Sequence, residues 1–287
     1  MQFVDVPPDP LAASSVWPNY MQLVTYPLFN SNARILFTRQ MNRQGYSTGI
    51  MLPRKVGLFT NVDVLRQVCE KETIFAMYIG LPMYVAHGFA RDAVRGLLAD
   101  RLCKNDRDYK VDTDARRKRL ALKYVAEFAS FPILYVATRQ IVSHVSLNPF
   151  KDLVDTITEA YAYGGLAVFW TGALPHVVSS ALEDGLNGGL DVVLNRQFGN
   201  ALEANDRFVL KMTWSVLVSC FTAPFVTWSV SRRASGGGPN FPDVSPWHQS
   251  IGDVTVGGFM FQVVLFSALF GVNLALIDAK KDEDRRR

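Results

Sequence analysis

Four stretches of the chain contain no Asp, Glu, Lys or Arg over 18 residues or more: 73–90, 160–182, 212–231 and 254–277. About 20 apolar residues in a helix cross the roughly 30 Å hydrocarbon core of a bilayer. One such stretch can be the core helix of a soluble protein, but four in one chain favour a membrane protein.

Two further segments extend this pattern. Residues 10–33 are uncharged, although their first part is rich in proline. Residues 120–144 contain Lys123, Glu127 and Arg139 around an apolar centre. The sequence therefore predicts an all-α membrane protein with six transmembrane helices.

Composition agrees with helices that have one lipid-facing side and one polar side. The chain is 49% hydrophobic and 20% charged, and its mean hydropathy is +0.09, between the values for soluble enzymes and for fully lipid-exposed bundles. The net charge of +4 is spread over interspersed acidic and basic residues, so no nucleic-acid partner is expected. The three cysteines are isolated, which predicts neither a metal site nor a disulfide.

A proline motif recurs in three apolar segments. Pro27 is followed by Arg34, and Pro132 by Arg139, at the same spacing; after Pro224 the arginine, Arg232, comes one residue later. A proline inside a helix removes a backbone hydrogen bond and costs about 3 kcal/mol in water. In a membrane protein, neighbouring helices can satisfy the freed groups. Three such prolines predict a repeated, kinked helix.

The segments after the first two prolines also match. Each begins with a short amphipathic stretch and then enters an apolar run marked by Gly80 or by Gly172, which lies 92 residues later. The apolar side of these stretches is predicted to comprise Val62, Leu65 and Val68 in the first and Leu153, Ile157 and Tyr161 in the second. Such stretches are typical of helices that lie at the membrane surface. The chain is thus predicted to be a single domain, 1–287, of three units: 15–104, 112–197 and an abbreviated 204–281.

Together these motifs resemble the mitochondrial carrier family. The aromatic-x-Gly element of that family matches Tyr78-Ile-Gly80 and Trp170-Thr-Gly172, and residues 277–281 resemble its acidic-x-x-basic element. The resemblance covers essentially the whole chain. It implies six transmembrane helices in three pseudo-symmetric repeats, with short surface helices, in the mitochondrial inner membrane.

The chain departs from the family at the charged positions that form the gate. The family's acidic position falls on Phe29, Leu134 and Val226, and its basic partner position on Asn32, Ala137 and Ser229. Ion pairs at these positions close one side of the carrier cavity and break during transport. Phe29, Leu134 and Val226 are instead expected to pack against one another.

Four polar residues within the predicted spans are candidate cavity residues. By the resemblance, Arg34 and Arg139 lie near the cavity floor, or they are anchors whose side chains reach the membrane interface. His87 and His176 are either cavity contacts or histidines hydrogen-bonded to a neighbouring helix. Separately, the basic cluster Arg116, Arg117, Lys118 and Arg119 either binds acidic lipid headgroups such as cardiolipin or is a solvated helix start.

Three functions follow from these expectations. The first is a structural or accessory subunit of an inner-membrane assembly such as a respiratory-chain complex, with other membrane-protein subunits as partners. The second is a transporter of a small solute with an unusual gate. The third, ranked lowest, is an insertase-like homologue in the outer membrane. No phosphate-binding loop, nucleophile elbow or HExxH motif is present in the sequence, so neither an enzyme nor a cofactor is predicted.

Overall fold

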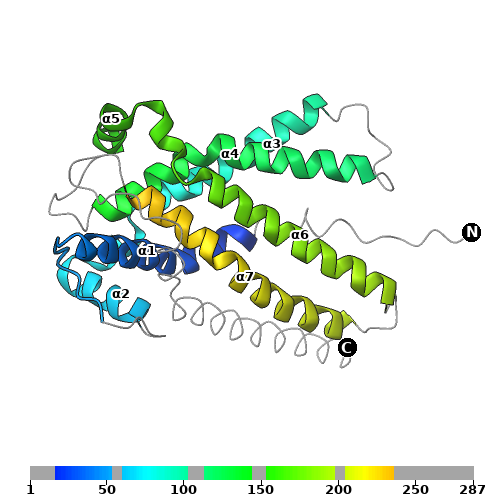
Figure 1. The fold of residues 1–287 in the computed structure, drawn as a ribbon, viewed down its shortest axis with the longest axis horizontal. Coiled ribbons are helices and arrows are strands. Elements are labelled where there is room, and N and C mark those ends of the chain that lie inside the picture. The colour runs from blue at the N-terminus through cyan, green and yellow to red at the C-terminus, as the bar shows by residue number, and fades with distance from the viewer. Residues whose placement is uncertain (1–16, 54–59, 103–112, 144–152, 198–203, 236–287) are drawn as a thin grey trace, which may run out of the picture.

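The structure is a computed structural model, and it describes residues 17–53, 60–102, 113–143, 153–197 and 204–235 (Figure 1). All elements in these ranges are helical, which confirms the predicted all-α class. The long helices run along the longest axis of the molecule in Figure 1.

The first two units have the same order of elements. The first comprises α1 (Trp17–Arg43), α2 (Thr60–Lys71), the 3-10 helix η2 (Ile74–Tyr78) and α3 (Leu81–Leu102). The second comprises α4 (Thr113–Ser143), α5 (Leu153–Gly164), the 3-10 helix η3 (Leu166–Trp170) and α6 (Ala173–Gln197). The third begins with α7 (Ala204–Ala234), and its predicted last span, 254–277, lies outside the described residues.

Two of the uncharged stretches do not form single straight helices, contrary to the prediction. Residues 73–90 divide into η2 and the start of α3, with a turn at Gly80, whose φ is +80°. Residues 160–182 likewise divide into the end of α5, then η3 and the start of α6, around Gly172 with a φ of +91°. Hydropathy detects neither turn, because the residues on both sides of each glycine are apolar.

The described residues contain one or two candidate membrane spans. One helical segment there, Leu120–Ser143, is long and apolar enough by itself to cross a membrane. A second candidate consists of Leu153–Gly164 and Leu166–Gln197, which meet the criterion together and are bent by 108°. The one described helix that could cross a membrane by itself is therefore the segment predicted at 120–144, which has an apolar centre between charged residues.

Four of the long helices pack as two antiparallel pairs. Each pair contains one proline-containing helix, and the third proline-containing helix, α1, contacts both pairs. α3 packs along α4, and α6 packs along α7, while α1, α4 and α7 contact one another. In Figure 1 the two pairs lie close together at the end of the molecule that carries α2 and α5, and they diverge toward the other end. The buried core lies where α1, α4 and α7 meet.

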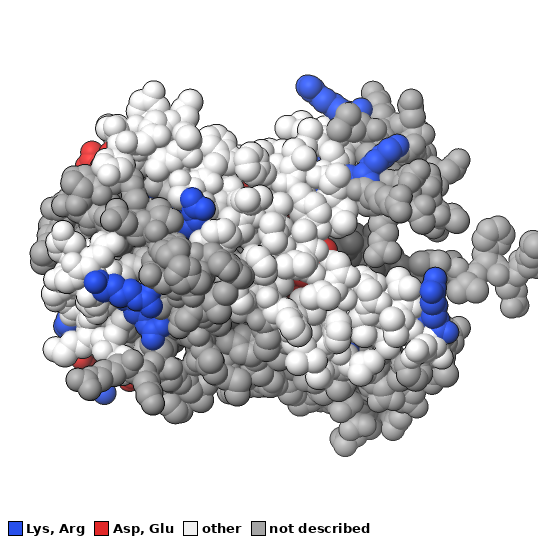
Figure 2. All heavy atoms as spheres, in the orientation of Figure 1, with Lys and Arg blue, Asp and Glu red and all other residues white. Residues whose placement is uncertain are grey.

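The surface distribution of charge follows the long axis. On the face drawn in Figure 2, lysine and arginine side chains of the described residues gather near the two ends, and the middle is largely uncharged. Small acidic patches are visible in the middle, between the two helix pairs.

The short helices α2 and α5 each have one side buried against the bundle and some exposed apolar residues. Val64 and Val68 are buried in α2, and Thr156 and Ala160 are buried at the corresponding positions of α5, each 92 residues later. Val62, Ile157 and Tyr161, which were predicted to form the apolar face, are exposed. Of the predicted set, Val68 is buried and Leu65 and Leu153 are half-buried. Exposed apolar residues are also what a helix at a membrane surface presents to lipid.

Candidate functional site

All three signature prolines lie inside long helices. Pro27 is in α1, Pro132 in α4 and Pro224 in α7. Pro132 leaves the carbonyl of Phe128 without its usual backbone donor. The indole Nε1 of Trp170 in η3 donates to this oxygen at 3.0 Å. The aromatic residue of the second aromatic-x-Gly element thus satisfies a group that the proline frees.

At two of the degenerate gate positions, Ala137 and Ser229, the backbone carbonyl lies against a glycine turn. A Cβ atom added to Gly80 would lie 2.7 Å from the carbonyl oxygen of Ala137. A Cβ added to Gly172 would lie 2.7 Å from the carbonyl oxygen of Ser229, and the Ser229 hydroxyl donates to the Gly172 carbonyl at 2.8 Å. Ala137 and Ser229 are also 92 residues apart. The turn of each of the first two units therefore fits against the proline helix of the next unit in the same way.

The predicted apolar packing of the former acidic positions is only partly correct. Leu134 is buried in the core, and Phe29 packs against both main core clusters. The Phe29 ring lies 5.9 Å from the Tyr26 ring and 5.1 Å from the Tyr84 ring, between centroids. Val226, however, is 44% exposed and does not join them. Asn32 is half-buried in α1.

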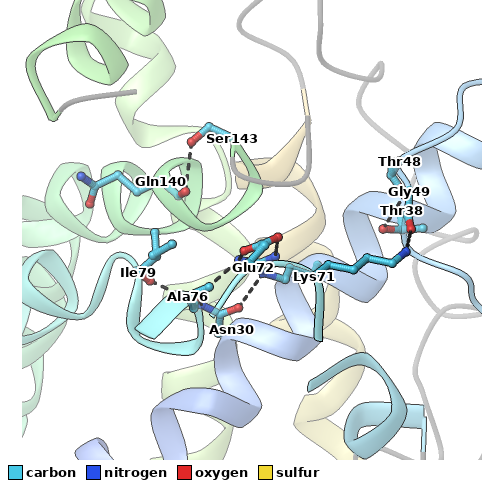
Figure 3. Close-up of polar contacts among 11 residues, drawn as sticks. Asn30, Thr38, Thr48, Gly49, Lys71, Glu72, Ala76, Ile79, Gln140 and Ser143 are labelled. Atoms are coloured by element: carbon cyan, nitrogen blue, oxygen red, sulfur yellow. Dashed lines mark hydrogen bonds and ion pairs between the residues drawn. The ribbon is translucent and has the colours of Figure 1, made fainter. Parts of the chain in front are cut away.

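Arg34 is fixed within the first unit. Its side chain is fully buried, and its guanidinium donates to both carboxylate oxygens of Glu72, at 2.9 and 3.3 Å. Its Nε donates to Asn30 at 2.8 Å, and Nη2 donates to the Ala76 carbonyl at 3.4 Å. Figure 3 shows Asn30, Glu72 and Ala76 gathered between α1 and the end of α2. This bidentate pair ties the proline helix to the short helix that follows it.

Arg139 is held by a different set of contacts, and the carboxylate of Glu159 in α5 lies within its electrostatic reach. The position 92 residues after Glu72 is Gly164. Arg139 instead donates to the hydroxyl of Tyr135 at 2.9 Å and to the carbonyl of Ala234 in α7 at 3.4 Å. Both Arg34 and Arg139 are buried, so neither side chain extends to the surface of the described bundle.

Arg233 of α7, which the sequence analysis did not single out, lies between the proline helices against rings of α1 and α4. It is 2% exposed, and its guanidinium carbon lies 5.9 Å from the Phe29 ring centre and 5.5 Å from that of Phe131. Its Nε donates weakly to the Ser229 carbonyl at 3.4 Å, but Nη1 has no hydrogen-bond partner among the described residues.

The contacts of Arg233 therefore offset only part of the free-energy cost of burying its positive charge. Cation–π contacts stabilise a buried cation by about 0.5 to 2 kcal/mol each. Removing an ion from water costs several kcal/mol even after the protein relaxes. The repeat pattern pointed to Arg232, but that side chain is only half-buried and stacks on Trp228, at 5.6 Å. Sequence spacing alone could not distinguish two adjacent arginines.

His87 and His176 lie near this arginine. The His176 ring is 5.6 Å from the Phe131 ring, and Arg233, His87 and Arg91 all lie within electrostatic reach of it. His87 is buried, and its Nε2 has no partner in the part of the chain that the structure describes. The alternative that His87 hydrogen-bonds to a neighbouring helix through this nitrogen is therefore not observed.

A second polar group connects α4 with α6. The Lys123 ammonium donates to Asp184 at 2.6 Å, and the Tyr124 hydroxyl donates to the same carboxylate at 3.1 Å. Next to them, Ser180 donates to Glu127, whose Oε2 has no partner among the described residues.

The candidate lipid contacts lie in the first turns of α4, which begins at Thr113. Lys118 is exposed there. The side chains of Arg116, Arg117 and Arg119 lie outside what the structure describes. Within the described ranges, no three His, Cys, Asp or Glu side chains lie close enough to hold a metal ion.

No protein-family model matches the chain, and no curated protein sequence matches it.

Proposed function

We propose that this chain is a diverged carrier-fold protein of the mitochondrial inner membrane, with a structural or accessory role in a larger membrane assembly such as a respiratory-chain complex. The carrier fold here means six membrane-spanning helices in three pseudo-symmetric units. Mitochondrial location follows from the sequence resemblance alone.

The repeated element order supports the fold part of this proposal. The five long helices contain 22 to 31 residues, so each is about 33 to 47 Å long, enough to cross a bilayer. On the face drawn in Figure 2, lysine and arginine side chains gather toward the two ends, as they do where lipid surrounds the middle of a bundle.

The contacts around the proline helices support the structural part of the proposal. They include close backbone contacts at Gly80 and Gly172, and aromatic packing around Phe29, where exchangers of the family have ion pairs. Ion pairs can exchange protein partners for water during a transport cycle. Apolar contacts lose their stabilisation when they open to water, since they gain nothing from solvation. Contacts of this kind favour a bundle that stays closed.

Native gel electrophoresis after gentle detergent extraction, followed by mass spectrometry, tests this role. A structural subunit is expected to migrate with its partner proteins, far above the ~32 kDa of the chain. Labelled-metabolite exchange by the purified protein in vesicles, at the rates of ordinary carriers, would overturn the proposal. Migration as a single chain together with such exchange would point to transport instead.

A solute transporter is the second candidate, and one observation favours it. His87, Glu127 and Arg233 are buried, and each has an unpartnered polar atom among the described residues. Buried polar atoms without partners are uncommon in purely structural cores and concentrate at binding sites. Uptake assays with His87→Ala and Gly88→Ala variants would test this: only the His87 change should abolish any transport.

A further inference from the structure

We propose that Arg233 is the centre of an internal anion site, with His87 and His176 beside it, which binds a carboxylate or phosphate group. This site is compatible with either proposed role, because the anion can be a transported solute or a structural ligand that exchanges with the buffer.

The first argument comes from the partners of the buried arginines. Arg34 has the Glu72 carboxylate, whereas Arg233, equally withdrawn from solvent, has no carboxylate partner within the described residues. Its known contacts are two aromatic rings and one long hydrogen bond within its own helix. A guanidinium is charged at every accessible pH and has five donors arranged for planar oxyanions. An anion is the missing partner that this chemistry requires.

The second argument is the arrangement of the neighbouring groups. Phe131 contacts both Arg233 and the His176 ring, and Phe29 contacts both Arg233 and Tyr84. His87 follows Tyr84 by one helical turn on α3. Five helices, α1, α3, α4, α6 and α7, therefore contribute side chains around one point. The unpartnered Nη1 of Arg233 and Nε2 of His87 both belong to this group.

The other charges nearby do not neutralise Arg233. Lys123 is paired with Asp184 at 2.6 Å, and Arg91 is paired with Asp92 at 3.2 Å. Glu127 lies close to Lys123, Arg91 and Asp184, on the side of α4 that faces α6. Among the described residues, the positive charge at the centre is therefore in excess, and the partly exposed side chains of Arg91 and Lys123 extend it toward solvent.

Thermal unfolding of the purified full-length protein, dialysed against a chloride buffer, tests the site. The probes are succinate and inorganic phosphate, added at constant ionic strength, and nanodiscs of phosphatidylcholine with or without cardiolipin. A ligand that binds only the folded protein raises Tm in a saturable way, and a rise of about 3 °C or more is expected. Arg233→Gln should abolish the rise. Arg66→Gln, which removes an exposed arginine from α2, should leave it unchanged.

The outcomes separate the sources of the anion. A response to succinate or phosphate, lost in Arg233→Gln, identifies a small anion; a response to cardiolipin alone, lost in the same variant, identifies a lipid headgroup. No response of the wild type, or an equal response of Arg233→Gln, overturns the proposal. If Arg233→Gln does not fold, Arg233→Lys decides, because lysine keeps the charge and loses the fork-shaped geometry. Its affinity should then be at least about fivefold weaker, and an unchanged affinity overturns the proposal.

Discussion

At the scale of single residues, Gly80 and Gly172 are the positions where the chain tolerates no side chain. Both have φ values near +80° to +90°, and both approach a carbonyl oxygen of the next proline helix. Gly88, eight residues further along the first unit than Gly80, lies in α3 with open space where its Cβ would be. The two kinds of glycine look alike in the sequence and differ entirely in their surroundings.

Alanine substitution is therefore expected to separate them. Gly80→Ala and Gly172→Ala should each destabilise the protein by about 2 to 4 kcal/mol, from backbone strain and overpacking. Gly88→Ala should be neutral or slightly stabilising, because alanine favours the helix. Thermal unfolding in detergent measures all three, and a Gly80→Ala protein as stable as wild type would contradict the close contact with Ala137.

The Arg34–Glu72 pair gives a second prediction at this scale. Breaking it should cost about 2 to 3 kcal/mol, toward the lower end for buried pairs because Glu72 is partly exposed. A double-mutant cycle with Arg34→Gln and Glu72→Gln measures the coupling. The exposed pair Arg66–Glu70 on α2 is the matched control and should couple much more weakly, because water screens both charges. Equal coupling in both cycles would mean that burial of Arg34 adds nothing.

At the scale of elements, the hydrogen bond from Trp170 to Phe128 compensates the kink in α4. Trp170→Phe removes the donor and should cost about 1 to 2 kcal/mol. In a Pro132→Ala background the alanine N–H can bond to the Phe128 carbonyl, so the same change should cost less. Unfolding of the two single variants and the double variant measures this non-additivity. Additive costs would show that the indole does not serve the freed carbonyl.

The boundaries of the elements were only partly predictable from the sequence. The proline helices could be located, because apolar content and Pro27, Pro132 and Pro224 mark them directly. The glycine turns were recognised as repeated landmarks, but not as breaks between a 3-10 helix and an α-helix. Hydropathy averages over side chains, whereas the break depends on the backbone conformation of one residue.

At the scale of the whole molecule, α2 and α5 lie at one end of the long axis, and the end of α6 and the start of α7 lie at the other (Figure 1). Cys69 on α2 and Tyr161 on α5 are both exposed and lie 92 residues apart. Asp191 in α6 pairs with Lys211 in α7 near the opposite end.

Accessibility to a membrane-impermeant thiol reagent tests this arrangement in sealed vesicles. In chains that keep only one cysteine, Cys69 and a Tyr161→Cys variant should be labelled from the same side of the membrane. An Asp191→Cys variant should be labelled from the opposite side. Labelling of Cys69 and the Tyr161→Cys variant from opposite sides would contradict a common surface for α2 and α5.

The sequence by itself determined the helical class, the three prolines at the centres of long helices and the loss of charge at Phe29, Leu134 and Val226. These features depend on residue type and local spacing, which the chain displays directly. Only the tertiary structure decided that Val226 is exposed, that Arg233 rather than Arg232 is buried, and that Arg139 bonds to Tyr135 and to the Ala234 carbonyl of α7. Each of these depends on how α7 or α5 is rotated against its neighbours, and that rotation is fixed by packing between helices distant in the chain.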